Sequence, residues 1–431
     1  MNDRTRTPLK VGSAITACLV AVITAGCSSD SGGSGEGAEV TELNIPVAEV
    51  PWLPSYQEIV AQYEDETGIA VNLTVFPFDG LLTQEANAAQ SGSNAFDLFQ
   101  INEQWVGQFY DNQWVQPLTD IDPDFTWDEN LIEFDGVGRW DTETRSTTVD
   151  GVPYALPING NITEFMYRKD IYEELGLEVP TTWDEAIENA NVARDAGAVT
   201  DGFVVRGKTP TFDFGAILAG EGGAWFEGAE DGDFTPTIDT PEMRAALEQF
   251  KALADVGPAA PQTVAQAEAT SLMQGGSLLQ GMLVTAVAAP LEDPGASNVA
   301  GQIGYAVVPG GTPTSGTWTM GIPAGLPEER TQAAYDFLNW LTSQETMQKW
   351  ADLGGITTRT DLDTDREDLQ VITDSEEQIV AALRYPFTPQ MLDITEPTIG
   401  QYLAGQLDLD STIEELETGV TRVVEEAGFL Q

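Results

Sequence analysis

The sequence predicts an α/β fold divided between two lobes, for three reasons. Helical and strand patterns alternate from Thr41 onward, without a long low-complexity segment or an obvious internal repeat. Such alternation is typical of sheets covered by helices. A hydrophobic content of 42% is high enough for most of the chain to fold. The length of 431 residues exceeds what one hydrophobic core ordinarily organises, so we expect two lobes.

The first 26 residues have the composition of an export signal. Three basic side chains within the first ten residues precede an apolar run over 11–23. The run is shorter than the roughly 20 residues that a spanning helix needs, and the small residues at 24–26 resemble a cleavage site. No later stretch of the sequence is long and apolar enough to cross a membrane. We therefore expect an exported protein.

The two cysteines lie at this end of the chain. Cys18 lies within the apolar run and should leave with the signal, so no intramolecular disulfide is expected. Cys27 follows the small residues in a pattern that resembles the lipobox of bacterial lipoproteins, with Thr24 where Leu is usual. The resemblance implies that Cys27 is acylated and becomes the mature N-terminus. The Ser/Gly tract after it is typical of a flexible tether. The alternative is ordinary cleavage nearby, which leaves an incidental thiol.

The first elements after the tether are a helix and a strand. Ile59, Val60 and Tyr63 share one helical face within 55–68, and Gly68 is a natural C-cap. Residues 69–76 then alternate apolar and polar side chains with the period of a strand.

Later helices carry clearer boundary signals. Thr182 and Glu185 have the spacing of a capping box, and Thr240 precedes a proline at a first helical position. We expect helices over 181–197 and 239–257, one long amphipathic helical stretch over 326–355, and buried strands at 96–101 and 202–207.

The charge and the missing histidines exclude several functions. A net charge of −52 repels nucleic acid and anionic lipid headgroups. It is a solubility feature or, alternatively, an adaptation to high salt. A chain without histidine cannot build Ser–His–Asp or Cys–His catalysis, and a zinc site would lack its commonest ligand. A carboxylate pair for glycoside hydrolysis stays open, because an acid-rich chain offers many pairs.

Two motifs have alternative interpretations. "GFVVRGKT", 202–209, fits the letters of a phosphate-binding loop, but its four middle residues read as a strand. The acidic runs at 120–125 and 361–368 lack the glycine and glutamate of an EF-hand, which leaves only a looser calcium site. We predict no cofactor and no metal.

Aromatic and amide residues gather at predicted strand ends and loops. Aromatic faces stack on the C–H faces of sugar rings, and amide side chains both donate hydrogen bonds to hydroxyl groups and accept them. Core packing is the alternative for each aromatic taken singly. Together they favour a neutral, hydroxyl-rich ligand. The group comprises Trp52, Asn102, Trp105, Asn159, Asn161, Trp225, Trp318, Tyr385 and Phe387.

From about Thr41 to the C-terminus, the chain resembles the carbohydrate-type extracellular solute-binding proteins (family 1) of bacterial ABC importers. Five segments occur in the family's order, which is specific evidence by consistency. The strongest contains "GVPYALPINGNITEFMYRKD" and the following "PTTWDEA"; the others are "YEDETGIAVNLTVF", "FDLFQINEQWVGQFY", "SGTWTMGIPAG" and "GGITTRTD". One aromatic platform of the family is missing, because this chain has Thr285 and Ala286 there.

The resemblance implies roles for particular residues. Asn102 and Glu103 match polar ligand contacts after a strand, and Asn159 and Asn161 match a short polar run between lobes. Trp318 matches the family's stacking tryptophan. Two further ligand contacts are expected, Trp52 and, with looser placement, Trp225. No catalytic residue is expected.

The implied fold is the periplasmic-binding-protein-like type II fold, with a hinge and an interlobe cleft. Its implied function is capture of a sugar or oligosaccharide by lobe closure and delivery to the permease. Expected partners are a carbohydrate, the permease subunits and the cell membrane through a lipid anchor, and the protein is expected to be a monomer. The alternatives are a non-sugar solute (a polyol, a phosphorylated small molecule or a metal chelate) or an anchored glycoside hydrolase.

The predicted boundaries follow from the same reading. Crossings between lobes are expected near 152–158, 304–310 and 360–370. The predicted parts are a signal over 1–26, a tether over 27–40, an N-terminal lobe over 41–152 with 310–365, and a C-terminal lobe over 153–309 with 366–431.

Overall fold

The computed structural model describes residues 40–430. The predicted signal, Cys27 and all but the last residue of the predicted tether lie outside the described residues. Within 40–430, no helix combines the length and apolar character that a membrane crossing requires.

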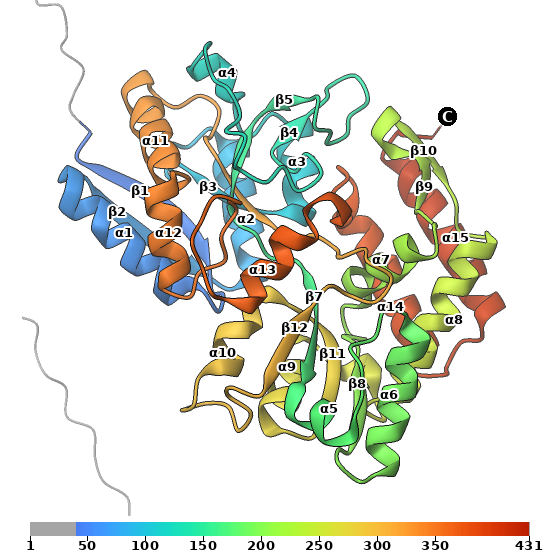
Figure 1. The fold of residues 1–431 in the computed structure, drawn as a ribbon. Helices are drawn as coiled ribbons and strands as arrows, with labels where there is room; N and C mark the ends of the chain where they lie inside the picture. Colours follow the sequence, from blue (N-terminus) through green and yellow to red (C-terminus); the bar gives the residue numbers. More distant parts are fainter. Residues whose placement is uncertain (1–39, 431) are drawn as a thin grey trace, which may run out of the picture. The chain divides into compact units, whose positions relative to one another are not determined.

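One hydrophobic core is organised by two small sheets. The parallel pair β1–β2 joins Glu42–Ala48 to Ala70–Phe76, and a second sheet has the order β3–β13–β6. Figure 1 shows α1, α11 and α12 side by side next to β1 and β2. The elements of this part are α1 (Leu53–Thr67), α2 (Phe78–Ser91), β3 (Phe99–Asn102), α3 (Val106–Asp111), α4 (Leu118–Ile121), β4 (Arg139–Trp140), β5 (Val152–Pro153), β6 (Ala155–Asn159), β13 (Trp318–Gly321), α11 (Glu328–Leu341), α12 (Gln344–Asp352) and α13 (Glu367–Asp374).

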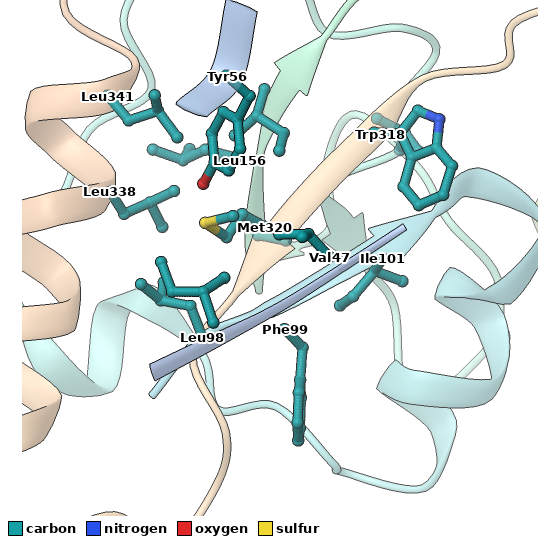
Figure 2. Packing of buried hydrophobic residues seen from close by; sticks show 14 of the residues in the cluster. Val47, Tyr56, Leu98, Phe99, Ile101, Leu156, Trp318, Met320, Leu338 and Leu341 are labelled. Atoms are coloured by element: carbon teal, nitrogen blue, oxygen red, sulfur yellow. The ribbon is translucent and has the colours of Figure 1, made fainter. Parts of the chain in front are cut away.

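The strand β13 connects this core to the region of the predicted site. Met320, fully buried, lies among Leu98, Leu338 and Leu341 in Figure 2. The Trp318 indole lies apart from that aliphatic cluster, at the other end of the same strand. One strand therefore carries both a core anchor and a predicted ligand contact.

The second core surrounds a four-stranded sheet with the order β12–β7–β11–β8. Strand β7 is antiparallel to both β11 and β12, and β8 runs parallel to β11. Figure 1 shows α6 beside β8 and α9 beside β11. The elements of this part are β7 (Thr163–Arg168), α5 (Lys169–Leu175), α6 (Trp183–Asp195), β8 (Asp201–Val204), α7 (Pro210–Gly220), β9 (Phe226–Gly228), β10 (Asp233–Pro236), α8 (Pro241–Asp255), α9 (Gln266–Gly275), β11 (Leu278–Val284), α10 (Ala288–Glu292), β12 (Ile303–Ala306), α14 (Thr388–Leu403) and α15 (Leu409–Glu426).

The chain changes from one core to the other at three places. Core membership switches between Ile162 and Phe165, between Val308 and Trp318, and between Ile379 and Leu383. The three segments are joined by isolated bridges that pair residue 162 with 315 and residue 314 with 380. They lie C-terminal to the crossings expected from the sequence, most clearly at the third, because α13 packs its apolar face into the first core.

The helix signals read from the sequence are largely confirmed. Helix α1 ends before Gly68, whose φ of 76° is the left-handed conformation that glycine adopts without strain. Both halves of the Thr182–Glu185 capping box are present, and the Thr240 side chain accepts a hydrogen bond from the Met243 N–H.

The single helical stretch expected over 326–355 is wrong in one respect. The structure has two helices there, α11 and α12, with Ser343 between them. The Ser343 side chain accepts a hydrogen bond from the Thr346 N–H and begins a new helix. The apolar period continues across the break, so periodicity alone does not reveal it.

A buried carboxyl group on α2 predicts a pH dependence of stability. Glu85 is fully buried and accepts a hydrogen bond from the Gln100 N–H at 2.8 Å, and burial raises its pKa well above the usual range. A raised pKa favours the folded state below the ordinary pKa, and this contribution is lost as the pH rises through the folded-state value. Glu85→Gln should therefore make the decline in the free energy of unfolding shallower as the pH rises above the ordinary glutamate range. Urea titrations across pH measure it, with the exposed Glu58→Gln as control; parallel profiles for Glu85→Gln and wild type would contradict the prediction.

Candidate functional site

A cavity of about 530 Å³ is lined by residues of both cores. The first core contributes the β1–α1 loop, the start of α2 and the ends of β3 and β13. The second core contributes the β8–α7 loop and the starts of α9 and α14, together with the end of β11. The size fits a small organic ligand.

Four aromatic rings form one wall of the cavity. Trp318 is central, with ring centroids 6.0 Å from Trp52, 5.7 Å from Phe78 and 5.7 Å from Trp105. The interplanar angles of 76°, 85° and 84° place each neighbour nearly perpendicular to the Trp318 ring. The three indoles are 4–5% exposed, and Phe78 is 38% exposed. This wall is an apolar surface held rigid by edge-to-face packing.

Glu103 lines the cavity and is fully buried. One carboxylate oxygen accepts hydrogen bonds from the Ala382 N–H and the Arg384 guanidinium, both at 3.2 Å. The other accepts from the Thr317 N–H at 3.0 Å and from the Ser315 hydroxyl. Burial raises the pKa of Glu103, whereas Arg384 and the other donors lower it, and the upward shift prevails. Both oxygens are thus engaged by the crossing segments.

Amide side chains supply polar groups on opposite sides of the cavity. The Asn102 Oδ1 accepts from the Gln104 N–H at 3.2 Å at the end of β3. The Asn161 Oδ1 accepts from the Ala286 N–H at 3.0 Å, which fixes the amide beside the end of β11. Both side chains are therefore oriented by the backbone before any ligand binds.

Arg206 is the one basic residue among the described residues that line the cavity. Its Nε donates to the fully buried Asp213 at 2.8 Å, and its Nη2 contacts the same carboxylate. Its guanidinium carbon lies 4.9 Å from the centre of the Phe212 ring. Gly207 follows without a Cβ, because a Cβ there would lie 2.5 Å from the Pro261 carbonyl oxygen. Close packing against Pro261 thus explains Gly207, the second glycine of "GFVVRGKT".

Residues 50–348 match the family described as "Bacterial extracellular solute-binding protein". The chain belongs to this family. The resemblance read from the sequence is confirmed.

The relatives of this solute-binding protein include an erythritol/L-threitol-binding protein of Mycolicibacterium smegmatis. The two are 24% identical over 358 residues, which span 77% of this chain and 72% of the relative. A ribitol complex of an ABC transporter solute-binding protein from Agrobacterium radiobacter K84 has a TM-score of 0.74 at 20% identity, covering 89% of this chain and 99% of that one. A D-mannitol complex from Agrobacterium vitis S4 has a TM-score of 0.71 at 22% identity, covering 90% and 100%. These structural matches confirm the predicted two-lobed fold.

Five of the seven predicted ligand contacts line the cavity: Trp52, Asn102, Glu103, Asn161 and Trp318. Two do not. Trp225 packs in the second core, 5.9 Å from Phe214 between ring centroids. Asn159 is fully buried in β6, and neither polar atom of its amide has a hydrogen-bond partner in the described structure.

Several lining residues were missed by the sequence analysis. Arg206 lies within the segment 202–209, which was considered only as a phosphate motif, and Phe212 follows it; that motif was the available signal. Gln266, Asp393 and Glu396 lie at helix surfaces where the sequence has no distinguishing pattern. The acidic runs considered for calcium do not form a group of three or more potential metal ligands within 40–430.

The Glu103 network predicts a large loss of stability on truncation. Glu103→Ala leaves the buried Arg384 with only the half-exposed Asp135 carboxylate as an ionic partner, and removing one partner of a buried pair costs about 3–5 kcal/mol. Urea unfolding at neutral pH measures the change. Glu345→Ala, which removes an exposed pair with Lys349, should cost less than about 1 kcal/mol. Equal losses in the two variants would contradict a special role for Glu103.

Proposed function

We propose that this protein is the binding component of an ABC importer and captures a sugar or polyol in the cavity around Trp318. The observation that carries the proposal is an aromatic wall on the first core, with the oriented amide of Asn102, that faces Arg206 and the Asn161 amide fixed beside the end of β11. Apolar ring faces suit the C–H groups of a polyhydroxylated molecule, and the amides suit its hydroxyl groups.

The relatives support this chemistry. One is named for erythritol and L-threitol, and two similar structures contain ribitol and D-mannitol. Polyols were an alternative ligand in the sequence analysis, and we now place them beside sugars. A phosphorylated ligand is disfavoured, because the cavity's one arginine is already paired with Asp213.

We propose that the ligand stabilises a closed arrangement of the two lobes. The paired segments around residues 162, 314 and 380 are the natural hinge, since backbone hydrogen bonds join them. We accordingly propose lobe boundaries at these core changes instead of near 152, 310 and 365. A ligand shifts such an equilibrium only through contacts made in the closed form.

We propose binding without chemistry. Both oxygens of Glu103 accept hydrogen bonds from protein donors, so this carboxyl group serves the fold and is not free to act as the acid or nucleophile that glycoside hydrolysis needs. Release of reducing sugar from any glycoside would contradict this proposal.

The location and partners follow from the family and the N-terminal sequence. We propose that Cys27 is acylated, that the protein is anchored on the extracytoplasmic face of the cell membrane, and that it delivers its ligand to the permease as a monomer.

Trp318 should contribute directly to ligand affinity. Trp318→Ala removes the central ring of the wall and should weaken binding of a polyol or sugar at least tenfold in calorimetry. Trp225→Ala is the matched control, because it also removes a buried indole but lies in the second core away from the cavity. Both variants should lose stability. Equal affinities for Trp318→Ala and Trp225→Ala would remove Trp318 from the site.

The anchor is tested by replacing its thiol. Cys27→Ser in the exported full chain should abolish incorporation of labelled palmitate and move the protein from the membrane fraction to the soluble fraction. Unchanged membrane association would contradict the lipid anchor, and ligand affinity serves as the control for correct folding.

A further inference from the structure

The Arg206–Asp213 ion pair holds an arginine in a fixed orientation at the wall of the cavity. The Asp213 Oδ2 accepts from the Arg206 N–H at 2.9 Å, and Oδ1 accepts from the guanidinium Nε and Nη2. Nη1 has only a long contact, 3.5 Å, with the Gln266 side chain. Arg206 is 6% exposed and lines the cavity, whereas Asp213 is fully buried behind it. The arginine therefore offers a fixed N–H donor at the wall.

The charges around the cavity are unfavourable to an anion. Arg206 is compensated by Asp213, and Glu103 is compensated by Arg384. The remaining charged side chains that line the cavity are carboxylates: Glu49, Asp393 and Glu396. No other lysine or arginine of residues 40–430 lines it. A carboxylate or phosphate entering the cavity would lose its hydration without meeting uncompensated positive charge.

We propose that the Arg206–Asp213 pair is a specificity determinant that makes the cavity select neutral polyols and sugars over the corresponding sugar acids. This inference rests on the proposed function and narrows its ligand class. Arg206 donates to ligand hydroxyl oxygens as a rigid hydrogen-bond donor, stacked on Phe212. Asp213 neutralises the positive charge that would otherwise attract an anion. Discrimination against acids therefore comes from the missing net positive charge, and affinity for neutral ligands comes from the Arg206 hydrogen-bond donor.

The test compares matched ligands that differ in one terminal group. The neutral probes are D-mannitol, ribitol and maltitol, and their acids are D-mannonate, D-ribonate and maltobionate. Thermal shift identifies which probes bind the wild-type protein, and calorimetry measures the neutral-to-acid affinity ratio for the best pair. We expect wild type to prefer the neutral member at least tenfold.

Two variants separate charge from hydrogen bonding. Asp213→Asn leaves Arg206 uncompensated, so affinity for the acid should rise and the ratio should fall at least tenfold. The double variant Arg206→Gln/Asp213→Asn removes both charges; it should lose at least tenfold in neutral affinity and gain none for the acid. If Asp213→Asn does not fold, the double variant carries the test, since it buries no unpaired charge.

Asp97→Asn is the matched control. Asp97 is also fully buried and paired with an arginine, Arg330, but neither residue lines the cavity. This variant should lose stability and keep the wild-type ratio.

Each outcome has a defined meaning. Wild type that binds an acid as well as its neutral partner overturns the inference, as does an unchanged ratio in Asp213→Asn or unchanged neutral affinity in the double variant. Binding of acids alone overturns the inference and leaves a solute-binding function standing. Failure of all six probes to bind contradicts the proposed sugar or polyol function, and the inference falls with it.

Discussion

The structure depends on one buried carboxylate at the point where its two cores meet. Glu103 directly follows β3 of the first core and receives hydrogen bonds from Thr317 and Ala382 on two different crossing segments. Arg384 adds a buried positive charge and also donates to the Phe134 carbonyl of the first core. A buried ion pair is weak evidence for stability by itself, but this one belongs to a network that joins two of the segments between the cores.

The two sides of the cavity are stabilised by different physics. The aromatic wall is held by ring packing that extends from Trp318 through Trp52 to Trp350, so its position depends on dense apolar contacts. The opposite side is held by directed bonds: an ion pair at Arg206 and a backbone-to-amide bond at Asn161. Non-directional contacts with the ring faces are thus combined with directional hydrogen bonds from the opposite side, which suits a ligand with apolar faces and hydroxyl edges.

Local signals in the sequence were sufficient for many elements and for part of the site. Gly68 and the Thr182–Glu185 box define helix ends through backbone chemistry that acts over a few residues, so they can be read without tertiary structure. Trp225 shows the limit: a glycine-rich turn precedes it, yet its ring packs on Phe214 of helix α7 in the second core. Arg206 is a cavity residue that the sequence analysis missed. Its position depends on Asp213, seven residues away across a strand-to-helix turn whose geometry cannot be read from the sequence.

The charge-compensated cavity lies in a chain whose net charge is −52, and the two features act over different distances. Exposed charges act through solvent, and their field decays over about 10 Å at 0.1 M ionic strength. A neutral ligand approaches without being repelled by that field, so its association does not depend on screening. The selection at Arg206 instead acts over hydrogen-bond distances behind low-exposure side chains, where salt screens little. The acidic surface is therefore compatible with a cavity that selects neutral ligands. The field of the surface charges acts through solvent, whereas selection depends on hydrogen bonds at direct contact distance.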